Sequence, residues 1–480
     1  MPKIRKFDTK VQYVEYRVLR ELARALWEDK LLHKVNSIPS DIVAKNESPM
    51  RCCIYKDRAI IQERIKIAIG ANDEINKNVI QVISIACDEC SRSGYTITDS
   101  CRGCMAHRCE DVCKFGAITY DENQKGHIDK TKCKNCGACA KVCPYSAIIN
   151  VRRPCEISCK VGAISMSASG EAEIDYNKCI SCGACVYHCP FGAVVDRSFI
   201  LDVIDIIKES GNNTKYKVYA AVAPSIAGQF SYAKPGQIIS GIKELGFYDV
   251  VEVAIGADMV AYSEAEELIN KNNLVTSSCC PAFVDYIEKN FPTLKDNISK
   301  SLSPMATIGK AVKNIDKNAK VVFIGPCTAK KAEFQKETVK PYIDYAITFA
   351  ELQALFDSRD IEINEMEETP LKSASYFGRV FAGSGGLTEA IAQGINEHGE
   401  KDFQFKPVTC NGIEECKLAL LKASKGLLDV NFIEGMACVG GCIGGAGCLT
   451  HEEKNKKEVI KYSKESNKTS IKEAIDNFVI

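Results

Sequence analysis

Cysteine is the residue type of this chain best suited to chemistry, and its spacing indicates metal binding. Sixteen of the 26 cysteines lie between Cys87 and Cys189. Two segments there, CKNCGACAKVCPYSAI (133–148) and CISCGACVYHCPFGAV (179–194), have the spacing CxxCxxCxxxCP. Such a run supplies three thiolates to one 4Fe–4S cluster and a fourth thiolate to a second cluster. The region therefore predicts several iron–sulfur clusters.

The cysteine-rich region is an internal repeat. CEDVCKFGAI (109–118) resembles CEISCKVGAI (155–164), and the two complete runs follow at the same offset of 46 residues. Each unit resembles a ferredoxin fold whose first half keeps only its last two cysteines. A row of 4Fe–4S clusters predicts an electron-transfer chain. The alternative is that the clusters only hold the fold together.

The repeat predicts which cysteines share a cluster. Each unit joins the first three cysteines of its complete run to one cysteine of the preceding segment. These two sets are Cys113, Cys133, Cys136 and Cys139 in unit one, and Cys159, Cys179, Cys182 and Cys185 in unit two. The upstream pairs CRGC and CDEC complete the cysteines that are left over. The resulting sets are Cys101, Cys104, Cys109 and Cys143, and Cys87, Cys90, Cys155 and Cys189.

Two other arrangements of these cysteines remain open. Paired CxxC units are also a zinc pattern, in which case the ligands would be Cys87, Cys90, Cys101 and Cys104. Alternatively, the two complete runs pair with each other and exchange Cys143 and Cys189 between their clusters. The expected number of accessory 4Fe–4S clusters is therefore two to four.

Three further segments place cysteines directly after apolar runs. They are VTSSCCPAF (275–283), VFIGPCTAKKAEF (322–334) and FIEGMACVGGCIGGAGC (432–448). Four thiolates from three loops can hold one more 4Fe–4S cube, and the glycines allow the backbone to approach a bulky ligand closely. Lys330 is suited to meet an anionic ligand on the metal. Cys279 and Cys280 can hardly ligate the same centre, because one backbone step points their side chains apart.

The elements that position these cysteines follow from hydrophobic patterning. From residue 216 onward, short apolar runs alternate with helical segments, which predicts an α/β domain whose loops carry the chemistry. The expected strands lie in VYAAVAPS, DVVEVAIGAD, VVFIGPC, RVFAGSGG and DVNFIEGMAC. Apolar residues at helical spacing predict helices in VEYRVLRELARALW, AIIQERIKIAI and RSFILDVIDIIKES.

These patterns predict a multidomain chain of the α+β and α/β classes, with a ferredoxin-like repeat domain before an α/β catalytic domain. The expected divisions are a helical region at 1–86, the iron–sulfur domain at 87–195, the catalytic domain at 216–450 and a charged tail at 451–480. The tail is rich in Lys and Glu and is expected to be a solvated helix or a frayed end.

Composition argues against several classes of protein. The 62 basic and 62 acidic residues give no reason to expect nucleic acid or a membrane surface as a partner. No window approaches the roughly 18 apolar residues of a membrane span, and the first residues lack a signal-peptide core. A chain of this length without an export signal does not fit the disulfide-rich secreted class. A cytoplasmic protein is expected.

The three cysteine segments of the α/β region resemble the signature motifs of the iron-only (FeFe) hydrogenases, TSCCPxW, MPCxxKxxE and ExMACxxGCxxGGG. The resemblance covers roughly residues 100–450. It implies an H-cluster, a 4Fe–4S cube bridged by cysteine to a two-iron unit that carries CO, cyanide and an amine dithiolate. The implied cube ligands are Cys280, Cys327, Cys438 and Cys442, with Cys442 as the bridge. Lys330 would bond a cyanide, and the implied pocket residues are Ala223, Pro224, Ser225 and Met436.

The same resemblance implies a proton route. Cys279 would pass protons to and from the bridging amine, and Glu264, Ser299 and Glu267 match the next members. A thiol and carboxylates with adjustable pKa values suit this work. Taken without the resemblance, Glu264 and Glu267 fit a solvated helix face.

Several positions depart from the family motifs. Gly325 stands where Met is usual, Phe283 where Trp is usual and Met305 where Gln is frequent, while Cys448 replaces a common Gln-Pro. The remaining cysteines, Cys52, Cys53, Cys410 and Cys416, are expected to be small apolar residues rather than ligands.

The resemblance implies an enzyme that interconverts protons, electrons and H2. Its electrons would come from a ferredoxin or flavodoxin, and its two-iron unit would require dedicated maturases. One alternative is a hydrogen-sensing protein of the same fold, although the chain contains no kinase-like segment. The other is a non-catalytic iron–sulfur assembly or carrier protein. Relatives of that kind lack the two-iron unit, whereas Lys330 and the full proton route are present here.

Overall fold

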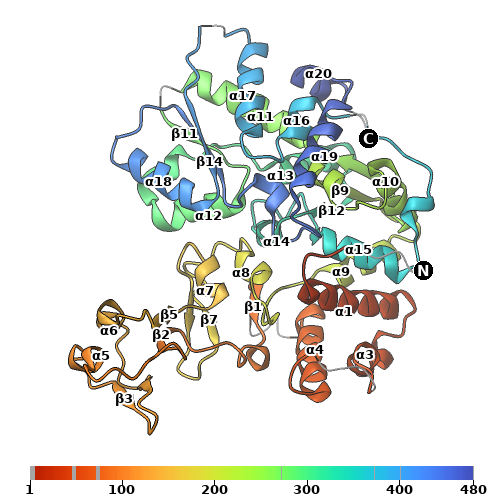
Figure 1. Cartoon of the computed structure of the whole chain (residues 1–480). Coiled ribbons are helices and arrows are strands. Elements are labelled where there is room, and N and C mark those ends of the chain that lie inside the picture. The colour runs from red at the N-terminus through yellow and green to blue at the C-terminus, as the bar shows by residue number, and fades with distance from the viewer. Residues whose placement is uncertain are drawn as a thin grey trace.

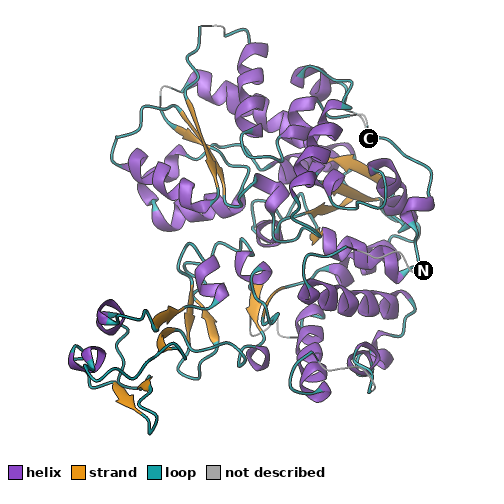
Figure 2. Cartoon of the chain, viewed as in Figure 1, coloured by secondary structure: helices purple, strands orange, loops and turns teal. Residues whose placement is uncertain are grey.

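The computed structural model describes residues 6–45, 50–71, 76–271, 273–371, 373–400 and 402–478. Figure 1 shows a cysteine-rich arm that extends from a larger C-terminal body, with the N-terminal helices beside both. The arm consists mainly of loops and very short elements, whereas helices surround the sheets of the body (Figure 2).

The N-terminal region is helical, as its apolar spacing predicts. Its helices are α1 (Lys10–Trp27), α2 (Leu31–Lys34), α3 (Ile38–Ile42) and α4 (Ile54–Ala68). Thr9 caps α1 and exchanges hydrogen bonds with Gln12, which satisfies free amides of the first turn. The face of α1 that includes Val18 and Leu22 is fully buried. This helix packs mainly on α15 (Phe349–Ser358), so it joins the helical region to the body.

The two units of the arm have the same local structure. Unit one contains α5 (Arg108–Asp111), hairpin strands β3 (Ile118–Tyr120) and β4 (Gly126–Ile128), and α6 (Ala138–Val142). Unit two contains α7 (Pro154–Ser158), β6 (Ile164–Met166), β7 (Ala172–Ile174) and α8 (Ala184–Tyr187). The last strand of each unit, β5 (Ile148–Val151) or β8 (Val194–Asp196), pairs antiparallel with β2 (Gly94–Ile97) or β1 (Ile80–Val82). The 46-residue repeat of the sequence is therefore also a repeat of structure.

Two parallel sheets form the centre of the body. The larger has the order β10 (Asp249–Glu252), β9 (Val218–Val222), β12 (Lys320–Gly325) and β13 (Tyr345–Thr348). The smaller has the order β11 (Val275–Thr276), β15 (Phe432–Met436) and β14 (Pro407–Asn411). The central strands are continuous apolar runs because helices cover parallel sheets on both faces. Every residue of β9 and of β15 is buried.

Helices fill the space around the two sheets. They are α9 (Ile200–Glu209), α10 (Pro235–Glu244), α11 (Val253–Asn270), α12 (Pro281–Asn290), α13 (Pro304–Ile315), α14 (Thr328–Glu333), α16 (Tyr376–Val380), α17 (Gly386–Glu397) and α18 (Ile413–Ser424). The longest of these, α11, packs against α13 on one side and α17 on the other. This helix carries Glu264 and Glu267, so it sets the direction of the expected proton route. None of the helices in the described ranges is long and apolar enough to cross a membrane.

One expectation from the sequence is wrong, and another is only partly right. RVFAGSGG does not contain a strand, because Ser375 caps α16 there and the buried Arg379 guanidinium pairs with Glu252 at 2.8 Å. The segment after residue 451 is helical, as one of the two expectations has it, but within the described residues it is neither frayed nor solvated on all sides. It forms α19 (Glu453–Lys464) and α20 (Ile471–Asp476), which pack on α16 and α11 respectively. Val459 and Tyr462 supply the buried face of α19 despite its many charges. Residues 479–480 of that segment lie outside the described residues.

Candidate functional site

Three loops bring the body cysteines together. They follow β11, β12 and β15, so the cysteines come directly after strands, as the apolar runs predict. Cys280 and Cys327 are the N-cap residues immediately before α12 and α14, and Cys438 lies on the loop that leads to Cys442. Chemistry at the carboxyl ends of parallel strands is the usual placement in α/β folds.

The four expected cube ligands are partly buried thiols that lie near enough to affect one another. Burial raises the pKa of Cys327 to about 11, and the neighbouring Cys280 thiol adds to the increase. Burial also raises the pKa of Cys442 to about 12, with further contributions from Cys327 and Cys280. The pKa of Cys438 is raised well above its ordinary value, by burial first and then by Cys327. Four neighbouring thiols of this kind suit a positively charged iron–sulfur core, because metal then replaces their protons.

Glycines allow the third loop to lie directly against the second. A Cβ atom on Gly445 would lie 2.4 Å from the carbonyl oxygen of Pro326, and one on Gly447 would lie 2.6 Å from Thr348. These glycines therefore permit a close approach between segments of the same chain. It holds the loop of Cys438 and Cys442 against the loop of Cys327.

A cavity adjoins three of the four thiols. The residues around it include Cys280, Cys327, Cys442 and Cys279, together with the expected pocket residues Ala223, Pro224, Ser225 and Met436. The Ser225 hydroxyl is fully buried and finds no hydrogen-bond partner within the described part of the chain. An unpaired buried hydroxyl is costly. The cavity therefore fits a bound group that carries polar ligands, as the two-iron unit does.

Lys330 places a buried positive charge at this cavity. Its ammonium donates to Glu333 Oε2 at 2.6 Å and to the backbone oxygen of Cys279 at 3.3 Å. Burial lowers the pKa of Lys330, but Glu333 and the nearby thiols outweigh this effect and raise the pKa above its ordinary value. The group therefore stays charged and can hold an anionic ligand. Glu333 is the last position of the second motif, and only the structure shows its role.

Cys279 and Glu264 of the expected proton route are buried near each other, and Ser299 is bonded to Glu267. Cys279 is buried, and the pKa of its thiol is raised well above the ordinary value by burial and then by Glu264. Glu264 accepts hydrogen bonds from the amide and the hydroxyl of Ser278, and the Ser299 hydroxyl donates to Glu267 Oε2 at 2.7 Å. Burial raises the pKa of Glu264 to about 7, while hydrogen bonds from Ser278 and Ser299 oppose this rise.

The Ser299–Glu267 pair lies nearer the protein surface. The Glu267 side chain is 13% exposed and pairs with Lys271 at 2.5 Å. Glu264 is 0% exposed, so a solvated helix face does not describe it. One oxygen of Glu264 has no hydrogen-bond partner among the described residues. The carboxyl can therefore still exchange a proton on that side.

The arm places members of each of the four predicted cysteine sets near one another. In three of these sets, neighbouring thiols raise the pKa of a cysteine of the same set. Burial raises the pKa of Cys155 to about 12, and the nearby thiols of Cys189, Cys87 and Cys90 add to this increase. The pKa of Cys185 is raised by burial and then by the other thiols of its set, Cys182, Cys179 and Cys159. The pKa of Cys139 is raised by burial and by Cys133 and Cys113. Cys136 lies beside them in the sequence and is exposed.

The fourth set lines a single cavity, which contains Cys101, Cys104, Cys109 and Cys143. This placement favours the four predicted sets over both alternative arrangements. Cys87 and Cys90 act on Cys155, which favours their predicted set over the zinc site. Cys143 lines a cavity with Cys101, Cys104 and Cys109, and Cys189 acts on Cys155, as the predicted sets require. The binding of clusters by these sets stays a prediction. Arg153 is buried beside one of them and lies 3.3 Å from Cys87 Sγ.

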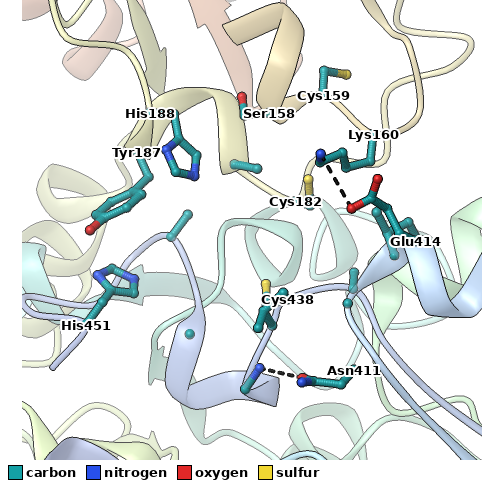
Figure 3. A pocket seen from close by; sticks show the side chains of 18 of the residues that line it. Ser158, Cys159, Lys160, Cys182, Tyr187, His188, Asn411, Glu414, Cys438 and His451 are labelled. Atoms are coloured by element: carbon teal, nitrogen blue, oxygen red, sulfur yellow. Dashed lines mark hydrogen bonds and ion pairs between the residues drawn. The ribbon is translucent and has the colours of Figure 1, made fainter. Parts of the chain in front are cut away.

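Unit two of the arm lies against the four-thiol group of the body. A pocket of about 450 Å³ separates them, with Cys182 from unit two and Cys438 from the body among its lining residues (Figure 3). The Thr328 hydroxyl, next to Cys327, donates to the backbone oxygen of Ser181 at 2.8 Å. A Cβ atom on Gly183 would lie 2.5 Å from Thr328 Oγ1, so the two loops are in direct contact. An electron on the unit-two cluster would therefore have a short path into the body.

Comparison with known families agrees with this geometry. The family described as iron only hydrogenase large subunit, C-terminal domain, matches residues 216–446. A 4Fe–4S dicluster domain matches residues 100–147, and a 4Fe–4S binding domain matches residues 172–195. The chain is an iron-only hydrogenase-like protein with ferredoxin-like domains.

Individual relatives of this hydrogenase-like chain fall into two groups. Iron hydrogenase 1 of Clostridium pasteurianum is 29% identical over 51% of this chain and 52% of its own length. The NADP-reducing hydrogenase subunit HndD of Solidesulfovibrio fructosivorans is 25% identical over 81% of this chain and 71% of its own length. Cytosolic iron-sulfur assembly component 3 of Mus musculus is 22% identical over 52% of this chain and 65% of its own length. The chain therefore spans about half of the first relative.

Solved structures resemble the same part of the chain. The apo FeFe hydrogenase HydA1 of Chlamydomonas reinhardtii has a TM-score of 0.47 at 20% identity. The match covers 58% of this chain and 94% of that one.

Two departures from the hydrogenase motifs have a structural cause. A Cβ atom on Gly325 would lie 2.4 Å from the ring of Phe323, so this ring occupies the space of the usual methionine. Phe323 lines the cavity, yet nothing in the strand pattern distinguishes it from its apolar neighbours. Phe283 is fully buried and lies directly over Gly435. Cys448 is buried and lies 3.3 Å from the backbone oxygen of Ile443, within the loop of Cys442.

Proposed function

We propose that this chain is an FeFe hydrogenase that interconverts two protons and two electrons with H2. Cys280, Cys327, Cys438 and Cys442 would hold the H-cluster, with Cys442 bridging the cube to the two-iron unit. The observation that carries the proposal is the placement of Cys279 in the cavity wall, of the buried Glu264 whose charge acts on it, and of the Ser299–Glu267 pair nearer the surface. A site that only binds a cube has no use for a buried proton route.

When bound, the H-cluster supplies the centre at which electrons and protons combine. Lys330 would hold an anionic ligand of the two-iron unit through its ammonium, which Glu333 fixes in place. Cys279 would deliver a proton from its sulfur to the cavity or remove one. Glu264 is suited to exchange protons with it near neutral pH, because its pKa is about 7. Ser299 and Glu267 would continue the route to water.

The cofactor set and the partners belong to the same proposal. The four cysteine sets of the arm would hold accessory 4Fe–4S clusters that relay electrons to and from the body. A ferredoxin or a flavodoxin would exchange these electrons, dedicated maturases would insert the two-iron unit, and the protein would work in the cytoplasm.

The second candidate is a non-catalytic iron–sulfur protein, which the names of several relatives favour. Cytosolic iron-sulfur assembly component 3 is one, and cytosolic Fe-S cluster assembly factor NAR1 of Sclerotinia sclerotiorum is another. Cys279, Lys330 and the unpaired Ser225 hydroxyl argue for the hydrogenase, because these groups face the cavity beside the cube ligands.

Infrared spectroscopy separates the two candidates. Anaerobic protein produced together with hydrogenase maturases should show CO and cyanide stretching bands, and absence of these bands would sink the hydrogenase proposal. Turnover with reduced methyl viologen then separates an enzyme from a hydrogen sensor, because a sensor would carry the bands without appreciable H2 evolution.

A further inference from the structure

The two units of the arm present equivalent faces to different surroundings. In unit two, Cys182 lies on the side of its cluster set that meets the body, since it shares a pocket with Cys438. The residue of unit one that corresponds by the 46-residue offset is Cys136, which is exposed. The face that meets the body in unit two is therefore open to solvent in unit one.

The residues around Cys182 are apolar and buried against the body, whereas their counterparts around Cys136 are exposed to solvent. In unit two, Ile180 is 1% exposed and belongs to an apolar cluster with Ala282 and Ala329 of the body. Its counterpart in unit one is Lys134, which is exposed. Val161 packs against the same apolar cluster, whereas its counterpart Phe115 is 45% exposed. We call Lys114, Phe115, Lys134 and Cys136 the unit-one face.

The contact in unit two also indicates the charge of the missing partner. Lys160 of unit two forms an ion pair with Glu414 of α18 at 3.5 Å, across the junction with the body (Figure 3). The counterpart of Lys160 is Lys114, which is exposed. Between Cys101 and Cys143 the exposed charges are predominantly basic. They are Arg102, Arg108, Lys114, Lys132, Lys134 and Lys141, against Glu110, Asp111 and Glu122.

From these observations we propose that the unit-one face is the docking site of an acidic electron-carrier protein. The carrier places its redox centre opposite Cys136, as the body places its own opposite Cys182. One electron passes from the reduced carrier to the cluster of Cys113, Cys133, Cys136 and Cys139, and the carrier is oxidised by one electron. Lys114 and Lys134 attract the carrier, and Phe115 supplies an apolar contact at the centre of the face. The proposal rests on the function proposed above for the source and use of the electrons.

Flavodoxin is a suitable probe because its flavin absorbance is distinct from that of iron–sulfur clusters. Holoprotein is mixed with the hydroquinone of a flavodoxin of net negative charge, and oxidation of the flavin is followed by stopped flow at several salt concentrations. The wild-type rate should fall as salt increases. The double variant Lys114→Glu, Lys134→Glu should lower the low-salt rate about tenfold and weaken the salt dependence, because charge attraction accelerates association. Phe115→Ser should slow transfer without changing the salt dependence.

Lys457→Glu is the matched control, because it reverses an exposed charge on α19 of the body. Its rate should equal that of the wild type. An unchanged low-salt rate in the double variant would overturn the proposal, and so would a wild type that oxidises no flavodoxin. H2 evolution from reduced methyl viologen tests the proposed function separately, since a small dye needs no docking face. If the wild type evolved no H2 and the double variant still oxidised the flavin slowly, the hydrogenase assignment would be wrong. The docking site would then still be supported.

Discussion

The arm and the cavity of the body are both rich in cysteine, but the exposure of their side chains to water differs. In the arm, Cys136 is exposed and most other cysteines are only partly buried. Around the cavity, Cys279 is buried and Ser225 is completely enclosed. Electrons can cross a protein boundary between clusters, whereas protons need groups that accept and release them. The dry cavity therefore requires its own proton route, and the arm does not.

Loss of a cavity ligand should give the largest effect. Cys280→Ala should remove the cube of the body and abolish H2 turnover, while the arm keeps its clusters because its cysteine sets are separate. Iron quantitation and electron paramagnetic resonance of the reduced protein measure the two regions independently. Retention of turnover by this variant would show that the cavity is not the reaction site.

Loss of the neighbouring thiol should leave the metal in place. Cys279→Ala should keep the iron content of the wild type but lower turnover by about 10²- to 10⁴-fold, the range for loss of a general acid–base group. Cys410→Ala is the control, because Cys410 is a buried thiol that lies outside the proton route. Normal turnover in Cys279→Ala would contradict the proton role.

Glu264 should show a smaller kinetic effect together with a change in stability. Glu264→Gln should lower turnover about 100-fold, because an amide does not exchange protons in this way. The pKa of Glu264 rises from its ordinary 4.5 to about 7 through burial, so the folded state binds more protons than the unfolded state between these values. The free energy of unfolding therefore falls as pH rises through this window, by at most about 3 kcal/mol.

The glutamine variant removes this loss of stability. Relative to wild type, its denaturation midpoint should be higher at pH 8 and should show no such gain at pH 4.5. Glu266→Gln changes an exposed carboxylate on the same helix and should alter neither turnover nor the pH dependence. If the denaturation midpoints of Glu264→Gln and wild type differed by the same amount at pH 8 and at pH 4.5, Glu264 would not titrate in this window.

Sequence alone predicted the cysteine chemistry better than the packing around it. The four arm sets follow from spacing, because their members lie close along a repeated chain. RVFAGSGG was misassigned because its apolar residues end a helix whose buried Arg379 pairs with Glu252, which lies far away in the sequence. The packing of the C-terminal segment on the body was missed because many charges conceal the buried face that includes Val459. Phe323 could not be distinguished, since its direction depends on the register of the sheet.

The smallest kinetic effect should come from the arm set nearest the helical region. The double variant Cys87→Ser, Cys90→Ser should lose one cluster, measured as iron content, because Cys155 and Cys189 cannot hold a cube by themselves. Turnover with methyl viologen should change less than about twofold, because the dye can reduce the clusters that remain.

Cys52→Ser, Cys53→Ser is the matched control, since it changes an adjacent pair that is not expected to bind metal. Its iron content should equal that of the wild type. Unchanged iron in Cys87→Ser, Cys90→Ser would remove the fourth cluster from the arm. A complete loss of dye-driven turnover would instead show that the arm and the cavity do not function independently.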